Sequence, residues 1–215
     1  MQELIERLIK RLKALYPDTG CTLDYTLDYT LLFNTRLAAQ CTDARVNIVS
    51  RELYEIFPTL EALAGADIEE MERIVKPCGF YRNKARDIIE AAVMLIGEYG
   101  GRVPDRMEDL LRLPGVGRKT ANLILGELFS KPAVVTDTHC IRLSNRLGLC
   151  DSKDPLKVER ALLAIIPPEE QLMFCHRLVA HGRAVCKARS PLCGACGAED
   201  LCAYNGINLE SGQNI

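Results

Sequence analysis

The chain has 215 residues and a formal net charge of −2, with 48% apolar and 26% charged residues. This length corresponds to one or two domains. The composition is ordinary for a globular protein and excludes collagen, low-complexity disorder and a disulfide-knot miniprotein. The overall charge gives no indication of a nucleic-acid partner, although binding depends on local charge rather than on the sum.

Neither export nor a membrane span is expected. Residues 1–7 are charged and amphipathic, unlike a secretory signal, and no apolar run reaches the roughly 18 residues that a membrane-spanning helix needs. We therefore expect a cytoplasmic protein. In that compartment the ten cysteines favour a metal site plus buried thiols over disulfides.

Helical periodicity dominates the chain from its start. An apolar stripe at helical spacing runs from Leu4 to Leu15, and Asp67, Asp105 and Asp154 each occupy a position where an N-cap residue would begin a helix. Strand signals are confined to one short segment, so the sequence predicts an all-α fold. The other predicted helices cover 30–40, 43–57, 68–76, 82–99, 106–112, 118–129, 138–147, 155–166 and 170–185.

Two glycines, Gly115 and Gly117, form a predicted tight turn between two of these helices. Glycine permits positive φ and close approach of another backbone, and a helix N-terminus presents N–H groups that bind phosphate without reading sequence. Val116 can pack inward, and Arg118 begins the second helix. This is the helix-hairpin-helix pattern of non-specific DNA binding, with a plain αα-hairpin as the alternative. No strand precedes the glycines, which argues against a dinucleotide-binding loop.

Lys119 lies in the first turn of that second helix, and positions 111–146 hold six basic and two acidic residues. Neighbouring cations and the positive end of a helix favour a neutral amine, which is the nucleophile of Schiff-base chemistry. A phosphate-binding lysine is the alternative. Asp137 follows the extended-looking segment 132–136. It is either an N-cap or a carboxylate that faces Lys119, and such a pair would suit base excision.

Four cysteines near the C-terminus are separated by six, two and five residues. Pro191, Gly194 and Gly197 allow the chain to wrap them around one centre. Zinc sites usually have about two to four residues between paired ligands, so these wider gaps favour a 4Fe–4S cluster, with zinc or disulfides as alternatives. Lys187 and Arg189, inside the first cysteine loop, can meet DNA phosphates or form a solvated face. The four cysteines are Cys186, Cys193, Cys196 and Cys202.

Taken together, these residues resemble the endonuclease III family, which comprises bifunctional DNA glycosylases with AP-lyase activity in the helix-hairpin-helix superfamily. The resemblance rests on residues 113–121 and 135–139 and on the cysteine spacing. It also includes residues 39–43 and 79–85 and covers nearly the whole chain. One departure is Arg36, which lies in a helix where relatives are usually aliphatic.

The resemblance implies an all-α helix-hairpin-helix DNA glycosylase fold of two helical domains with the active site in the cleft between them. Residues 22–132 would form a six-helix barrel, and 1–21 with 133–215 would form the iron–sulfur cluster domain. Lys119 would attack the anomeric carbon of the damaged nucleotide and displace its base, with Asp137 as the partner carboxylate. Elimination from the resulting Schiff base would then cut the strand on the 3′ side.

The resemblance also implies a 4Fe–4S cofactor and a monomer that acts at the prokaryotic nucleoid on duplex DNA carrying damaged pyrimidines or abasic sites. The base must first leave the stack, and Gln40 and Phe80 match family residues that fill or wedge the gap. For Phe80, a core aromatic is the alternative. The expected DNA-binding residues are Gln40, Phe80, Gly115, Val116, Gly117, Arg118, Lys187 and Arg189.

Three other functions are weighed against this enzyme. A non-catalytic helix-hairpin-helix DNA-binding protein would not need a lysine and an aspartate in these positions, and an iron–sulfur electron carrier would not need the hairpin. Mismatch-specific glycosylases of the same superfamily usually lack the hairpin lysine or carry tyrosine there. The presence of Lys119 therefore disfavours them.

Overall fold

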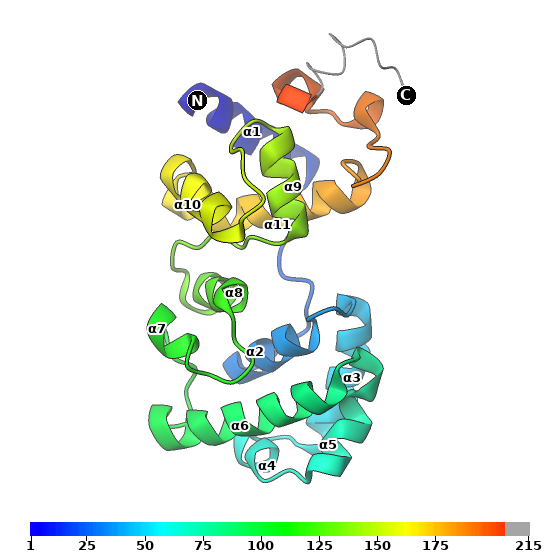
Figure 1. Ribbon diagram of the computed structural model, residues 1–215, viewed down its shortest axis with the longest axis vertical. Helices are drawn as coiled ribbons and strands as arrows, with labels where there is room; N and C mark the ends of the chain where they lie inside the picture. Colours follow the sequence, from blue (N-terminus) through cyan, green and yellow to red (C-terminus); the bar gives the residue numbers. More distant parts are fainter. Residues whose placement is uncertain (205–215) are drawn as a thin grey trace. The chain divides into compact units, whose positions relative to one another are not determined.

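A computed structural model describes residues 1–204, and the regular secondary structure in this range is entirely helical (Figure 1). The predicted all-α class is therefore confirmed for the described residues. None of the described helices combines the length and apolar character that crossing a membrane requires. The α-helices are α1 (Gln2–Leu15), α2 (Asp28–Leu37), α3 (Asp43–Ile56), α4 (Leu60–Ala64), α5 (Ile68–Val75), α6 (Tyr81–Tyr99), α7 (Met107–Leu110), α8 (Arg118–Phe129), α9 (Thr138–Arg146), α10 (Pro155–Ile165) and α11 (Gln171–Ala184), and the short 3₁₀ helices are η1 (Lys76–Cys78), η2 (Pro168–Glu170), η3 (Cys193–Ala195) and η4 (Glu199–Leu201).

Side-chain caps account for several helix starts. Asp67 and Asp154 accept hydrogen bonds from first-turn N–H groups of α5 and α10, as the sequence predicts. The predicted cap at Asp105 is wrong, because α7 begins at Met107 and its N-cap is Arg106, whose side chain forms no capping bond. The backbone is still extended at Arg106, and an aspartate one residue before the N-cap position is too far from the first turn to cap it.

One predicted helix boundary in the first half of the chain needs correction, and one helix there is absent from the prediction. The helix predicted to end at residue 40 ends at Leu37, because Gln40 has a φ of 56°, which a right-handed helix does not allow. Helix α4 was not predicted at all. It has only five residues, which is too short to display helical periodicity, and Thr59 caps it by accepting the N–H of Ala62 at 3.1 Å.

The chain divides into two compact units. Residues 21–130 form one, which we call the inner unit, and residues 1–20 with the described residues from Lys131 onward form the other, which we call the terminal unit. In the inner unit, α4 and α5 pack against α6, while α2 packs against α3, α6 and α8 (Figure 1). Fully burying an aliphatic side chain contributes about 1.5–3 kcal/mol, and the inner core includes Leu31, Leu37, Leu53, Leu63, Met71, Ile88, Leu95 and Ile124.

In the terminal unit, α11 packs against both α1 and α9, and α9 also packs against α10. Gly182 permits the close contact of α11 with α9, since a Cβ at this position would lie 2.5 Å from Nδ1 of His139. None of the ten cysteines forms a disulfide within the described residues. The buried side chains of this unit include Ile5, Leu8, Leu12, Leu143, Val158, Leu162, Phe174 and Leu178.

Candidate active site

The glycine turn lies between α7 and α8 in the inner unit. Gly115 has a φ of 73°, a conformation that L side chains rarely adopt. Val116 is half-buried against the inner core, and its N–H donates to the carbonyl of Leu113 at 3.1 Å. The hairpin is therefore closed by backbone bonding and by inward packing of the residue between the two glycines.

An ion pair lies directly against Gly115. Both Nε and Nη2 of Arg36, on α2, are 2.7 Å from Oδ2 of Asp87, on α6, and the side chains are only 20% and 13% exposed. A Cβ at Gly115 would come within 2.5 Å of Nε of Arg36 and 2.7 Å of Oδ2 of Asp87. The turn can therefore rest on this pair only because residue 115 is a glycine.

Helix α8 begins at a glycine N-cap. The backbone of Gly117 is extended, and as a glycine it has no side chain to cap the first turn. Arg118 and Lys119 are the first two helical residues and both are exposed. The N-terminus of a helix can bind an anion such as a phosphate. The amine of Lys119 is thus attached to the positive end of a helix and is accessible from solvent.

Asp137 caps α9 in the terminal unit. Its Oδ1 accepts the N–H of Cys140 at 2.7 Å, so the predicted N-cap is confirmed. The preceding residues 132–136 are neither helix nor strand, and Asp137 itself is half-buried with extended backbone. Among the described residues, only Oδ1 of this carboxylate takes part in a hydrogen bond. Capping and chemistry can therefore use different oxygens of one side chain.

Gln40 and Phe80 are both exposed residues of the inner unit with left-handed backbone. Their φ values are 56° and 47°, and such a conformation costs a non-glycine residue on the order of 1–3 kcal/mol. Phe80 is 63% exposed, so the core-aromatic alternative for this residue is wrong. Strain of this kind is maintained only where the surrounding structure holds it, and it is often found at functional positions.

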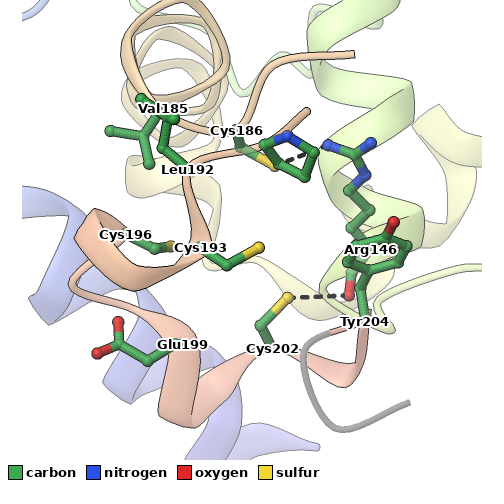
Figure 2. A pocket seen from close by; sticks show the side chains of 10 residues that line it. Arg146, Val185, Cys186, Leu192, Cys193, Cys196, Glu199, Cys202 and Tyr204 are labelled. Atoms are coloured by element: carbon green, nitrogen blue, oxygen red, sulfur yellow. Dashed lines mark hydrogen bonds between the residues drawn. The ribbon is translucent and has the colours of Figure 1, made fainter. Parts of the chain in front are cut away.

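All four cysteines of the C-terminal group line one pocket that opens to solvent (Figure 2). Arg146, on α9, also lines it and donates from Nη1 to Sγ of Cys186 at 3.2 Å. On another side, Sγ of Cys196 lies 3.3 Å from Nε2 of His181, on α11. Nitrogen atoms of side chains on two helices therefore lie within hydrogen-bonding distance of the sulfur atoms that would ligate a metal centre.

Four cysteine thiols are a donor set that either a zinc ion or a 4Fe–4S cluster accepts. Four thiolates on one zinc lie about 3.8 Å apart, given a Zn–S bond of about 2.3 Å, and within residues 1–204 no group of three or more ligating side chains is arranged to hold a metal ion. In a 4Fe–4S cluster each thiolate binds a different iron, so the sulfur atoms are farther apart. Burial and the nearby thiols Cys202 and Cys186 raise the pKa of Cys196, and bound iron cations would offset that effect.

The two basic residues of the first cysteine loop are on the surface. Lys187 and Arg189 are both exposed. Arg146 holds their loop by donating to the carbonyl oxygens of Lys187 at 2.7 Å and Ala188 at 3.1 Å. The same arginine thus contacts the thiol of Cys186 and the backbone of the loop that carries Lys187 and Arg189.

Comparison with known proteins gives a consistent result. Residues 34–168, which include the hairpin, Lys119 and Asp137, match the family described as HhH-GPD superfamily base excision DNA repair protein. Endonuclease III of Synechocystis sp. is 49% identical over 192 residues, covering 89% of this chain and 88% of its own length. The Bacillus subtilis endonuclease III is 40% identical over 199 residues, covering 92% and 91%.

Solved structures agree with the sequence relatives. A structure described as a trapped endonuclease III–DNA covalent intermediate has a TM-score of 0.91 and 40% identity, covering 97% of this chain and 99% of its own. A thermostable thymine-DNA glycosylase has a TM-score of 0.84 at 21% identity, which shows the shared fold. The predicted helix-hairpin-helix glycosylase fold is thereby confirmed, and the chain belongs to the endonuclease III family of base excision DNA repair glycosylases and AP lyases.

Proposed function

We propose that this chain removes oxidised pyrimidines from duplex DNA with Lys119 as the nucleophile and then cleaves the abasic strand. The observation that carries the proposal is the position of Lys119, exposed in the first turn of α8 directly after the glycine turn. A phosphate bound at the N-terminus of α8 would bring the sugar of the same strand to the amine. A relative that forms a trapped covalent intermediate with DNA supports covalent chemistry.

The proposed reaction breaks three bonds of the damaged nucleotide in turn. Nζ of Lys119 forms a bond to C1′ of the damaged nucleotide, and the bond from C1′ to the base breaks, with its electron pair leaving on the base. The sugar ring then opens: the C1′–O4′ bond breaks, O4′ takes up a proton, and C1′ and Nζ become a protonated Schiff base. This group acidifies C2′, and loss of a C2′ proton breaks the C3′–O bond, which expels the 3′ phosphate and cuts the strand. The carboxylate of Asp137 would accept the proton of the attacking amine or stabilise positive charge on the sugar.

Several exposed groups would hold the DNA for this reaction. The turn at Gly115, Val116 and Gly117 and the adjacent Arg118 would contact the backbone at the hairpin, which gives affinity without sequence preference. Lys187 and Arg189 would contact phosphates beside the cysteine loop. Gln40 and Phe80 would occupy the space that the extruded nucleotide leaves in the stack.

We further propose that the four cysteines hold a 4Fe–4S cluster, since they line one pocket and two of their sulfur atoms lie within hydrogen-bonding distance of Arg146 and His181. Such a cluster would fix the loop that carries Lys187 and Arg189, and so contribute to binding rather than to the bond-breaking steps. A cluster domain of 1–21 and 133–215 beside a barrel of 22–132, a monomeric state and a location at the cytoplasmic nucleoid belong to the same proposal.

The test is a cleavage and trapping assay on duplexes with thymine glycol, dihydrouracil, uracil or an abasic site. Wild-type protein should cut oxidised pyrimidine and abasic substrates and form a borohydride-stable adduct. Lys119→Gln should form none, while Lys153→Gln, which alters another exposed lysine, should act as wild type. Binding without cleavage by the wild-type protein would instead identify a non-catalytic DNA-binding module. A colourless, zinc-containing preparation would refute the cluster.

A further inference from the structure

A lysine that the proposed chemistry does not use is completely buried in the inner unit. Lys84 belongs to the first turn of α6 and has no exposed surface. It shares the buried stripe of this helix with Ile88 and Leu95. A buried ammonium is unfavourable unless its charge and its N–H groups are matched by other groups. The partners of Lys84 therefore indicate what it does.

Three main-chain carbonyls receive the three N–H bonds of this ammonium. Nζ of Lys84 lies 2.8 Å from the oxygen of Leu37, 2.7 Å from that of Ala39 and 2.7 Å from that of Cys78. The first two carbonyls lie at the C-terminal end of α2: Leu37 is the last residue of the helix, and Ala39 lies two residues after it. A cation is favoured there by the helix dipole. The third is the last residue of η1. One side chain thus joins two segments that are far apart in the sequence.

Each of these segments leads directly into one of the two strained, exposed residues. Gln40 follows Ala39, and its φ is 56°. Phe80 follows Cys78 by two residues, with Gly79 between them, and the φ values of Gly79 and Phe80 are 71° and 47°. The carbonyl oxygens of Ala39 and Cys78 can be no farther apart than the sum of their bonds to Nζ. The buried Lys84 therefore limits the distance between the backbone segment before Gln40 and the segment before Phe80.

We propose that Lys84 is a positioning residue for base extrusion, which holds Gln40 and Phe80 in the strained backbone that lets them replace the extruded nucleotide. This rests on the DNA repair function proposed above. A methionine at position 84 would fill the same space but leave the three carbonyls without their donor. Both segments could then relax to ordinary backbone conformations, and the two exposed side chains would change direction relative to each other.

The experiment compares a substrate that needs base extrusion with one that does not. Lys84→Met is assayed in single turnover on a duplex with dihydrouracil opposite 2-aminopurine, and by borohydride trapping on a preformed abasic site. Excision should fall by between about tenfold and a hundredfold, the effect of misplacing a group by about 1 Å. The 2-aminopurine fluorescence change should also shrink, while trapping stays within about twofold of wild type. Lys76→Met, which removes an exposed lysine from η1, serves as the charge-matched control.

A double-mutant cycle tests whether Lys84 acts through Phe80. In a Phe80→Ala background, Lys84→Met should reduce excision by far less than it does alone. If Lys84→Met does not fold, Gly79→Ala gives a second test, since alanine disfavours the φ of 71° and would displace Phe80 with Lys84 in place. It should show the same selective loss of excision. Equal loss on both substrates, or wild-type excision in these variants, would overturn the proposal, whereas failure of the wild-type protein to trap would refute the repair function instead.

Discussion

Variants of Asp137 can separate a structural role from a catalytic one, because the same carboxylate caps α9 and is the proposed partner of Lys119. Asparagine caps helices about as well as aspartate, so Asp137→Asn keeps the bond from the N–H of Cys140, which is 2.7 Å long in the wild type. Asp137→Ala loses both the cap and the charge. The two variants therefore differ in stability but share the chemical defect.

The expected magnitudes follow from that one hydrogen bond. Loss of an N-cap side chain costs about 1 kcal/mol, which for a chain of this size lowers Tm by roughly 2–4 °C. Asp137→Ala should show this shift, and Asp137→Asn should remain within a few tenths of a kcal/mol of wild type. Removing a group that transfers a proton reduces a rate by about 10²–10⁴. Both variants should therefore lose excision by a similar factor in that range.

Thermal unfolding by circular dichroism and single-turnover excision of dihydrouracil measure the two effects on the same preparations. Binding to an uncleaved abasic analogue should stay near the wild-type affinity for Asp137→Asn. Full activity in Asp137→Asn would refute a chemical role for the carboxylate. An equal loss of stability in both variants would refute the assignment of the Oδ1 bond as the source of the capping energy.

Two further predictions concern packing and the support of the hairpin. Gly182→Ala should destabilise the protein by about 1–3 kcal/mol, because the new Cβ meets Nδ1 of His139 in a tightly packed contact. Gly97→Ala changes an exposed position in α6 with no atom near its Cβ, and should stabilise the protein by about 1 kcal/mol. Urea unfolding measures both changes in stability, and equal effects of the two variants would contradict the close packing at Gly182. Arg36→Leu should lower the stability of the protein by roughly 1–3 kcal/mol and weaken binding to an abasic duplex, because Asp87 beside the glycine turn loses its counter-charge. Arg51→Leu removes an arginine from an exposed ion pair and should lower the stability by less than about 1 kcal/mol. The same loss in both arginine variants would show that the pair under the turn has no special role.

Helices could be predicted because their signals are local. Apolar spacing and N-cap residues such as Asp67 and Asp154 act within one or two turns, so predicted and observed starts agree closely for α5 and α10. Asp105 has the same chemistry, but it stands one residue before the N-cap, and spacing alone does not distinguish these two positions. Helix α4 was missed because five residues do not cover enough turns to show a period.

The site residues that were missed depend on contacts between distant segments. Arg36 stands out in the sequence as a cation among apolar residues, but its partner Asp87 is 51 positions away. Lys84 lies on the apolar stripe of α6 with Ile88, and that placement was the available signal. A lysine is ordinarily assigned to solvent, so the sequence did not indicate that it binds carbonyls at the end of α2. These carbonyls belong to the last residue of α2 and to the residue directly before Gln40.

The central claim is that the amine of Lys119 forms the covalent bond to DNA, and mapping the adduct tests it most directly. Wild-type protein is reacted with an abasic duplex, reduced with borohydride and digested with protease and nuclease, and the modified peptide is identified by mass spectrometry. The account predicts that the sugar remnant is attached to Lys119, at the start of α8. Attachment to another amine, such as that of Lys187 or the N-terminus, would contradict it.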